Sequence, residues 1–167
     1  MKKIILSLLL FIPWGMFAQV QKHAVVDEMS VIGAMPEIPS VETEIAKLTK
    51  EFQAEYQKLL DDYNRKFSAF TQQQDSLSEN IKILRLQEIQ EITTKTQNFV
   101  PMAEETIARK RQELLTPIQE KVQKAIQEVG AENGLAYILP KDPQIVLYSG
   151  SSAIDVTDKV KAKLGIK

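Results

Sequence analysis

The sequence contains no cysteine, so the chain forms no disulfide and offers no thiol nucleophile or thiolate metal ligand. Its single histidine, His23, has no cluster of carboxylates beside it, which argues against a metal site. Glycine is scarce, with 6 residues, and none belongs to a phosphate-binding loop motif. The adjacent carboxylates Asp61-Asp62 and Glu104-Glu105 point about 100° apart on a helix, so neither pair forms a site. We therefore expect no enzymatic activity, no cofactor and no bound metal.

Aromatic residues are also few, at 7%, whereas 26% of residues are charged, a mixture that suits long solvated helices better than a thick core. The formal net charge of −1 becomes about −3 if Lys2 and Lys3 are removed with the N-terminal segment. A mildly acidic chain lacks the basic face that phosphate contacts require, so nucleic acid is not an expected partner.

The N-terminus has the features of a secretory signal peptide over residues 1–18. Lys2 and Lys3 precede the apolar run IILSLLLFI, and Ala18 supplies a small residue at the expected cleavage site. The apolar run is shorter than the about 20 residues that a membrane-spanning helix needs, although an uncleaved anchor is the alternative. We predict an exported protein that is cleaved after about Ala18.

The rest of the chain divides into a body, a helical arm and a return to the body. We predict a strand near 24–27 and a short helix near 29–34 within residues 19–39, and an arm over residues 40–116. From Ser40, apolar residues recur every three or four positions, as on the buried side of an amphipathic helix. These positions are Val41, Ile45, Leu48, Phe52, Tyr56, Leu59, Tyr63, Phe67 and Phe70.

The arm is predicted to turn back near residues 72–79. Ser76 and Glu79 have the spacing of a capping box, which predicts the start of a second helix over about 77–133. Asn133-Gly134 is a typical helix end. Residues 117–167 then complete the body with the returning helix, strands near 135–139 and 145–149, and a C-terminal helix.

The prolines predict a neck where the arm meets the body. Pro39 precedes Ser76 by 37 residues and Pro117 follows it by 41, so the two lie at a similar height in an antiparallel hairpin. Each interrupts helical hydrogen bonding. At 1.5 Å per residue the arm is roughly 60 Å long. Pro101 predicts a further kink within the second helix.

The predicted fold is α+β and mostly α, with a long antiparallel hairpin beside a small sheet. Two helices bury only a narrow stripe each, and three short strands make a weak isolated sheet. Both features favour oligomerisation, in which strands of several chains complete one shared body and cover their edges.

Five aromatic residues of the first arm helix have two interpretations. They either form the core of the hairpin or line an inner surface that offers apolar contacts to a non-native client protein. The residues are Phe52, Tyr56, Tyr63, Phe67 and Phe70.

Both ends of the chain resemble the Skp/OmpH family of periplasmic chaperones. The resemblance rests on Val25-Val26-Asp27 after the signal peptide, Leu115-Thr116-Pro117-Ile118, Ala136-Tyr137-Ile138-Leu139 and Asp155-Val156-Thr157-Asp158. It implies a periplasmic homotrimer with a shared β body, in which three hairpin arms hold unfolded outer-membrane proteins without ATP. Under this reading the trimer body includes Val25, Val26, Ile138, Val146 and Leu147, and the neck includes Pro39 and Pro117.

The charge of the arm departs from that family, whose well-studied members are strongly basic. Near the tip, Asp75 and Glu79 oppose Lys82 and Arg85, so the sequence predicts no basic tip. We therefore carry over neither lipopolysaccharide binding nor steering of clients by charge, and contact with the membrane surface has no support. The alternative function is a structural or adaptor protein of the cell envelope, whose coiled-coil arm binds one folded partner.

Overall fold

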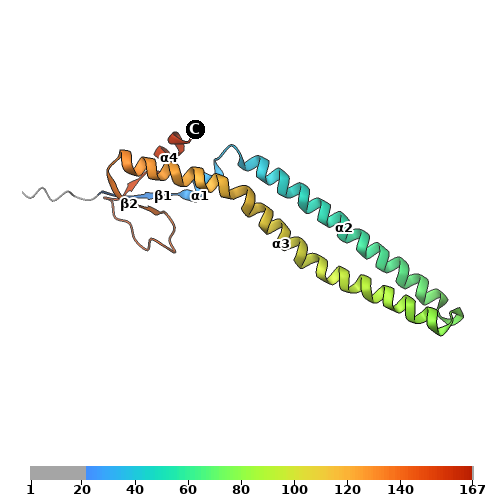
Figure 1. Cartoon of the computed structure of the whole chain (residues 1–167). Helices are drawn as coiled ribbons and strands as arrows, with labels where there is room; N and C mark the ends of the chain where they lie inside the picture. The colour runs from blue at the N-terminus through green and yellow to red at the C-terminus, as the bar shows by residue number, and fades with distance from the viewer. Residues whose placement is uncertain (1–21, 167) are drawn as a thin grey trace, which may run out of the picture.

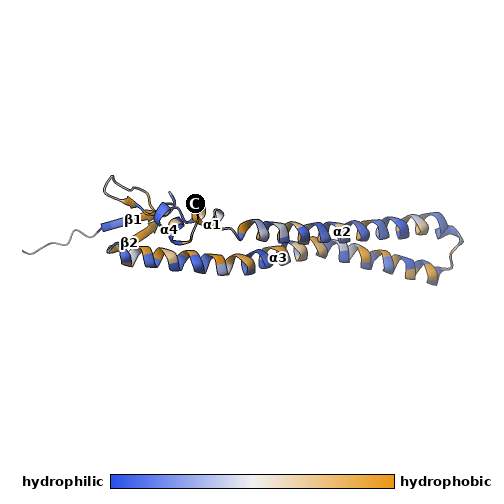
Figure 2. Ribbon diagram, turned by 90° about the horizontal axis from the view of Figure 1, so that it is seen from above, coloured by the Kyte–Doolittle hydropathy of each residue, from blue (hydrophilic) through white to orange (hydrophobic). Residues whose placement is uncertain are grey.

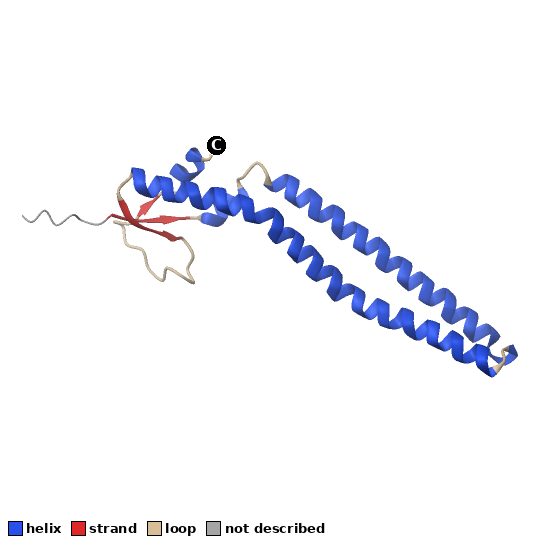
Figure 3. Cartoon of the chain, in the orientation of Figure 1, coloured by secondary structure: helices blue, strands red, loops and turns tan. Residues whose placement is uncertain are grey.

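The computed structural model describes residues 22–166 and shows a small body from which one long helical hairpin projects (Figure 1). The predicted signal peptide over residues 1–18, with its cleavage site, lies outside the described residues. The elements in chain order are β1 (Lys22–Val26), α1 (Glu28–Gly33), α2 (Ile38–Gln73), the 3-10 turn η1 (Gln74–Ser76), α3 (Glu79–Glu132), β2 (Leu135–Pro140), β3 (Ile154–Asp155) and α4 (Thr157–Lys163). The predicted fold class, a mostly helical α+β chain with a long hairpin and a small sheet, is confirmed (Figure 3).

The sheet has three strands in the order β2-β1-β3, and β1 pairs in parallel with both neighbours. The strand predicted near 145–149 is wrong, because the third strand is β3 at Ile154–Asp155. Both edges of β1 are already occupied, and the backbone N–H groups of Ile145 and Val146 instead donate to the carbonyl of Asp142 in a turn. The β-prone residues therefore lie in a loop between β2 and β3.

The body core lies between one face of the sheet and the helices α1, α3 and α4. Alternate β1 residues, Ala24 and Val26, point into this core, as expected for the two-residue period of a strand. Asp27 caps α1 by accepting a hydrogen bond from the backbone N–H of Ser30 at 2.8 Å. The core is completed by Met35, which follows α1, and by the helix residues Val31, Ile118, Val122, Ala125, Val129 and Val160.

The helical hairpin pairs α2 with the first two thirds of α3. Pro39 lies in the first turn of α2, where a missing N–H costs no helical hydrogen bond. Pro101 and Pro117 lie inside α3, which continues through both of them. The α3 ribbon changes direction where it leaves the body and again midway along the arm (Figure 1). Lys121 donates to Glu37 at 2.6 Å across the base of the hairpin, which places Pro39 and Pro117 at a similar level.

The tip differs from the predicted capping box. Helix α3 begins at Glu79, its N-cap is Ser78, and no side chain caps it. The Ser76 hydroxyl instead donates to the carbonyl of Gln73 at 2.8 Å, because Ser76 belongs to the η1 turn rather than to the helix entry. At the other end, Asn133 is the C-cap and Gly134 has a φ of 60°, the left-handed conformation that glycine adopts readily.

Candidate functional site

The aromatic residues of α2 lie along the seam that faces α3. The ring centroid of Phe99 on α3 is 5.9 Å from that of Phe52 and 6.2 Å from that of Tyr56. Tyr63 and Phe67 stack on each other at 5.7 Å, and Phe67 remains 48% exposed. Phe52, Tyr56, Tyr63 and Phe70 are half-buried. Phe52 and Tyr56 therefore pack across the hairpin against α3, and all five aromatic residues still present surface to the outside.

Two adjoining hollows between α2 and α3 expose this ring surface; together we call them the central groove. One hollow, of about 290 Å³, is lined by Thr49, Phe52, Gln53, Tyr56, Phe99, Val100, Ala103, Glu104 and Ile107. The other, of about 270 Å³, is lined by Tyr56, Leu60, Tyr63, Thr93, Thr96, Gln97 and Val100. Tyr56 and Val100 border both hollows, so the groove is continuous along the middle of the arm.

Helix α3 also carries exposed apolar side chains. Its exposed apolar residues, each at least 40% accessible, are Ile81, Ile83, Leu84, Leu86, Val100 and Met102. In Figure 2 hydrophobic and hydrophilic residues alternate along both arm helices, whereas hydrophobic residues gather on the sheet. The signal in the sequence is that α3 has more apolar residues than one 3.6-residue stripe can bury.

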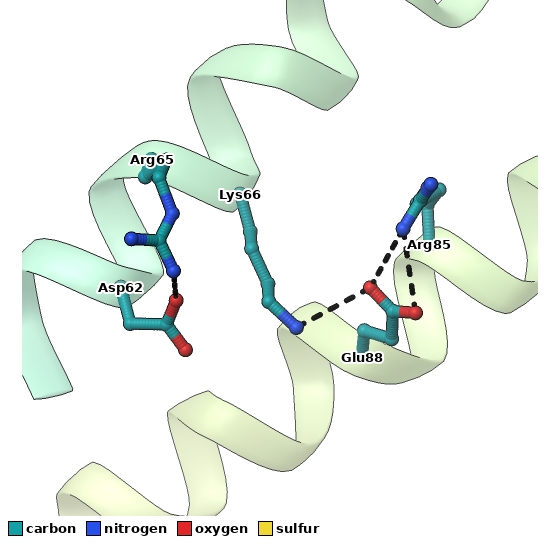
Figure 4. Close-up of polar contacts among 5 residues, drawn as sticks. All are labelled: Asp62, Arg65, Lys66, Arg85 and Glu88. Atoms are coloured by element: carbon teal, nitrogen blue, oxygen red, sulfur yellow. Dashed lines mark hydrogen bonds and ion pairs between the residues drawn. The ribbon is translucent and has the colours of Figure 1, made fainter.

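Ion pairs hold the two helices together near the tip. Lys66 on α2 donates to Glu88 on α3 at 3.4 Å, and Arg85 donates to the same carboxylate at 3.1 Å (Figure 4). The hydrogen bond from Arg85, followed by that from Lys66, lowers the pKa of Glu88 below its usual value. A neighbouring pair joins Arg65 to Asp62 within α2. Acidic and basic groups are thus matched here, and the described part of the tip has no excess of positive charge.

The residues predicted to form a trimer body occupy different environments. Val25 and Val26 are buried in β1. Ile138 of β2 packs against Gly130 of α3, so closely that a Cβ added at Gly130 would lie 3.3 Å from the Ile138 side chain. Leu147, in the loop between β2 and β3, is 90% exposed, and Val146 is half-buried.

Further apolar side chains of the body are exposed. Tyr137 and Leu139 of β2 and Ile145 and Tyr148 of the loop are all exposed. The ring of Tyr137 stacks on that of His23 at 5.9 Å. The body therefore presents aromatic and aliphatic surface outside its core.

The loop that carries Leu147 is closed by an ion pair at its base. Lys141 donates to Asp155 at 2.8 Å, and the backbone N–H and hydroxyl of Thr157 also donate to this carboxylate. The hydrogen bond from Lys141, with those from Thr157, lowers the pKa of Asp155 to about 2. The exposed loop is therefore anchored to the sheet at both ends.

Within residues 22–166 no group of three or more histidine and carboxylate side chains could hold a metal ion. No helix in the described part of the chain is long and apolar enough to cross a membrane. The candidate contact surfaces in the described part of the chain are the central groove, the exposed apolar residues of α3 and the exposed apolar residues of the body.

Comparison with known proteins identifies the family. Residues 22–164 match the family of outer membrane proteins described as OmpH-like. A crystal structure of a candidate outer membrane chaperone (OmpH-like) from Caulobacter crescentus CB15 has the same fold, with a TM-score of 0.70 at 14% sequence identity over 87% of this chain and 84% of the other. Curated protein sequences gave no match. Because the family match spans nearly all of the described residues, this chain belongs to the outer membrane protein (OmpH-like) family.

Proposed function

We propose that the protein is a periplasmic, ATP-independent holdase chaperone that binds unfolded outer-membrane proteins and prevents their aggregation before membrane insertion. The observation that carries this proposal is the apolar surface left exposed on the arm. Val100 at mid-arm, and Ile83 with Leu84 and Leu86 nearer the tip, are each between 42% and 53% exposed. Exposed apolar side chains that gather in a patch are characteristic of a binding site for other proteins, and Ile83, Leu84 and Leu86 lie within four consecutive residues of α3.

The proposed assembly is a homotrimer in which three bodies share one β structure and three arms surround a cavity. The exposed side chains of Tyr137, Leu139, Leu147 and Tyr148 support a protein interface on the body. Among residues 22–166 no strand pairs with the outer edge of β2, which supports pairing with another chain, since an unpaired strand edge is a template for association.

The test is suppression of aggregation. A urea-unfolded outer-membrane β-barrel protein is diluted into buffer and its light scattering is followed with and without the chaperone. We expect scattering to be suppressed near one trimer per client and without ATP. Persistent scattering at several-fold excess of the trimer would refute the proposed function.

The same protein used as bait in periplasmic extract separates the holdase from an adaptor. A range of unfolded barrel proteins is expected among the bound partners. One folded partner in stoichiometric amount would favour the adaptor instead.

A further inference from the structure

We propose that the central groove is the part of the arm that binds the client, and that its occupant is an extended, uncharged and largely apolar segment of a non-native polypeptide. This inference rests on the proposed holdase function and adds the location and the chemistry of the contact. It also explains how a chain of nearly balanced charge binds clients without electrostatic steering.

The first argument is the absence of charge in the lining of the groove. The hollow nearer the tip, which Tyr56 and Tyr63 line, has no charged residue. The hollow nearer the body, which Phe52 and Phe99 line, has one charged residue, Glu104. A neighbouring hollow between the same helices has a lining that is mostly charged: Glu44, Lys47, Glu51, Arg109, Lys110 and Glu113, with Leu48 and Thr106. A charged segment would lose hydration in the central groove without gaining a counter-charge, so an uncharged occupant fits it best.

The second argument is that the threonines of the groove are less polar than their residue type indicates. The hydroxyls of Thr93 and Thr96 donate to the carbonyls of Ile89 and Ile92 in the preceding turn of α3, each at 2.8 Å. Their hydroxyl protons are thus bonded within the helix, and their methyl groups remain available for apolar contact. The rings of Tyr56 and Tyr63 add large apolar faces with a polar tip that tolerates water.

The third argument is that the fold keeps this groove open. Pro101 directly follows Val100, which borders both hollows, and it cannot donate to the carbonyl of Gln97. Interhelical ion pairs tie the helices on either side of this stretch, with Lys110 bound to Glu44 at 2.9 Å and Lys66 to Glu88 at 3.4 Å. The middle of the hairpin, where Pro101 interrupts the hydrogen bonding of α3, therefore lies between two interhelical ion pairs that fix the helices on either side of it.

An environment-sensitive dye tests the location, because the absence of native cysteine permits labelling at one engineered position. Val100→Cys places the dye in the groove. Met102→Cys is the matched control, since Met102 is 44% and Val100 42% exposed on the same helix and Met102 borders neither hollow. On addition of the urea-unfolded barrel protein, we expect a blue shift and stronger emission from the Val100→Cys conjugate and little change from the control.

Equal changes in emission from the two conjugates would refute the groove as the client-binding site and leave the holdase function intact. So would an unchanged emission from Val100→Cys while scattering is still suppressed. Failure of the unlabelled protein to suppress scattering would instead refute the function itself. A blue shift that grows with the concentration of labelled protein alone would assign the groove to a second copy of the chain. A response to a folded barrel protein equal to that with the unfolded one would also overturn the proposed occupant.

A pair of amide-to-carboxylate substitutions tests the chemistry. Gln97→Glu adds charge to the groove, and Asn98→Asp adds it to the next residue, which is exposed and borders neither hollow. We expect Gln97→Glu to weaken client binding about tenfold, the cost of partly burying one unpaired charge, and Asn98→Asp to leave it within about twofold. Circular dichroism checks that both variants remain helical. Equal losses of affinity in the two variants would contradict an uncharged contact. A wild-type affinity that falls more than about threefold as salt is raised to about 0.5 M would contradict it as well.

Discussion

Replacing Pro101 with alanine tests whether this proline keeps the middle of the arm open. Pro101 is exposed inside α3, so the substitution removes no packed side chain and restores a donor to the carbonyl of Gln97. An interior proline disfavours a helix by about 3 kcal/mol relative to alanine. Proline also restricts the unfolded chain, and replacing it with alanine removes this restriction, which offsets about 0.5–1 kcal/mol of the gain. We therefore expect the arm to become more stable by about 2 kcal/mol.

Amide hydrogen exchange measures this gain locally. A change of 2 kcal/mol corresponds to about 30-fold slower exchange for amides that open with the middle of the arm. The body amides around Val122 should be unaffected, and Pro143→Ala, in an exposed turn outside the helices, is the control. We also expect weaker client binding, because a straighter α3 closes the groove. Unchanged exchange around Gln97 in the Pro101→Ala protein would refute this account of the bend.

Three other predictions concern the body. Because the pKa of Asp155 is lowered from 3.8 to about 2, its ionised form contributes stability above about pH 4 that is lost as the pH falls toward 2. Asp155 and Lys141 form a half-exposed pair, so we expect Asp155→Asn to lower the free energy of unfolding by about 1 kcal/mol at pH 7. In urea titrations the free energy of unfolding of this variant should depend less on pH between 4 and 2. The same pH dependence as in the wild type would show that the pair does not contribute to stability. Val122→Ala, at a fully buried position, should lower the free energy of unfolding by about 2 kcal/mol, and a loss under 0.5 kcal/mol would mean that the core relaxes around the cavity. Leu147→Glu should weaken the trimer in sedimentation equilibrium without lowering helix content, whereas an intact trimer would exclude this loop from the interface.

The helical elements of the fold were predictable because their signals are local. The recurrence of apolar residues from Val41 to Phe70 reports the buried side of α2, and Asn133-Gly134 marks the end of α3. The third strand was not predictable in the same way. Residues 145–149 have β propensity, but a strand also needs a free edge, and β1 pairs with Ile154 and Asp155 instead.

The candidate site was predictable in part. Periodicity placed Phe52 and Tyr56 on the side of α2 that faces its partner helix, but the sequence could not reveal that Phe99 packs against both rings. Val100 and Met102 were missed because they lie off the regular stripe, and their exposure depends on how widely the two helices are separated. The capping box at Ser76 failed because the η1 turn extends the hairpin tip and delays the start of α3 to Glu79.

Native mass spectrometry of the protein mixed with a urea-unfolded outer-membrane barrel protein tests the holdase assembly most directly, since it counts the chains in the complex. The account predicts a species containing three copies of this chain and one unfolded client, formed without nucleotide. A complex of one copy with one folded partner, or a trimer that never acquires the unfolded client, would contradict it.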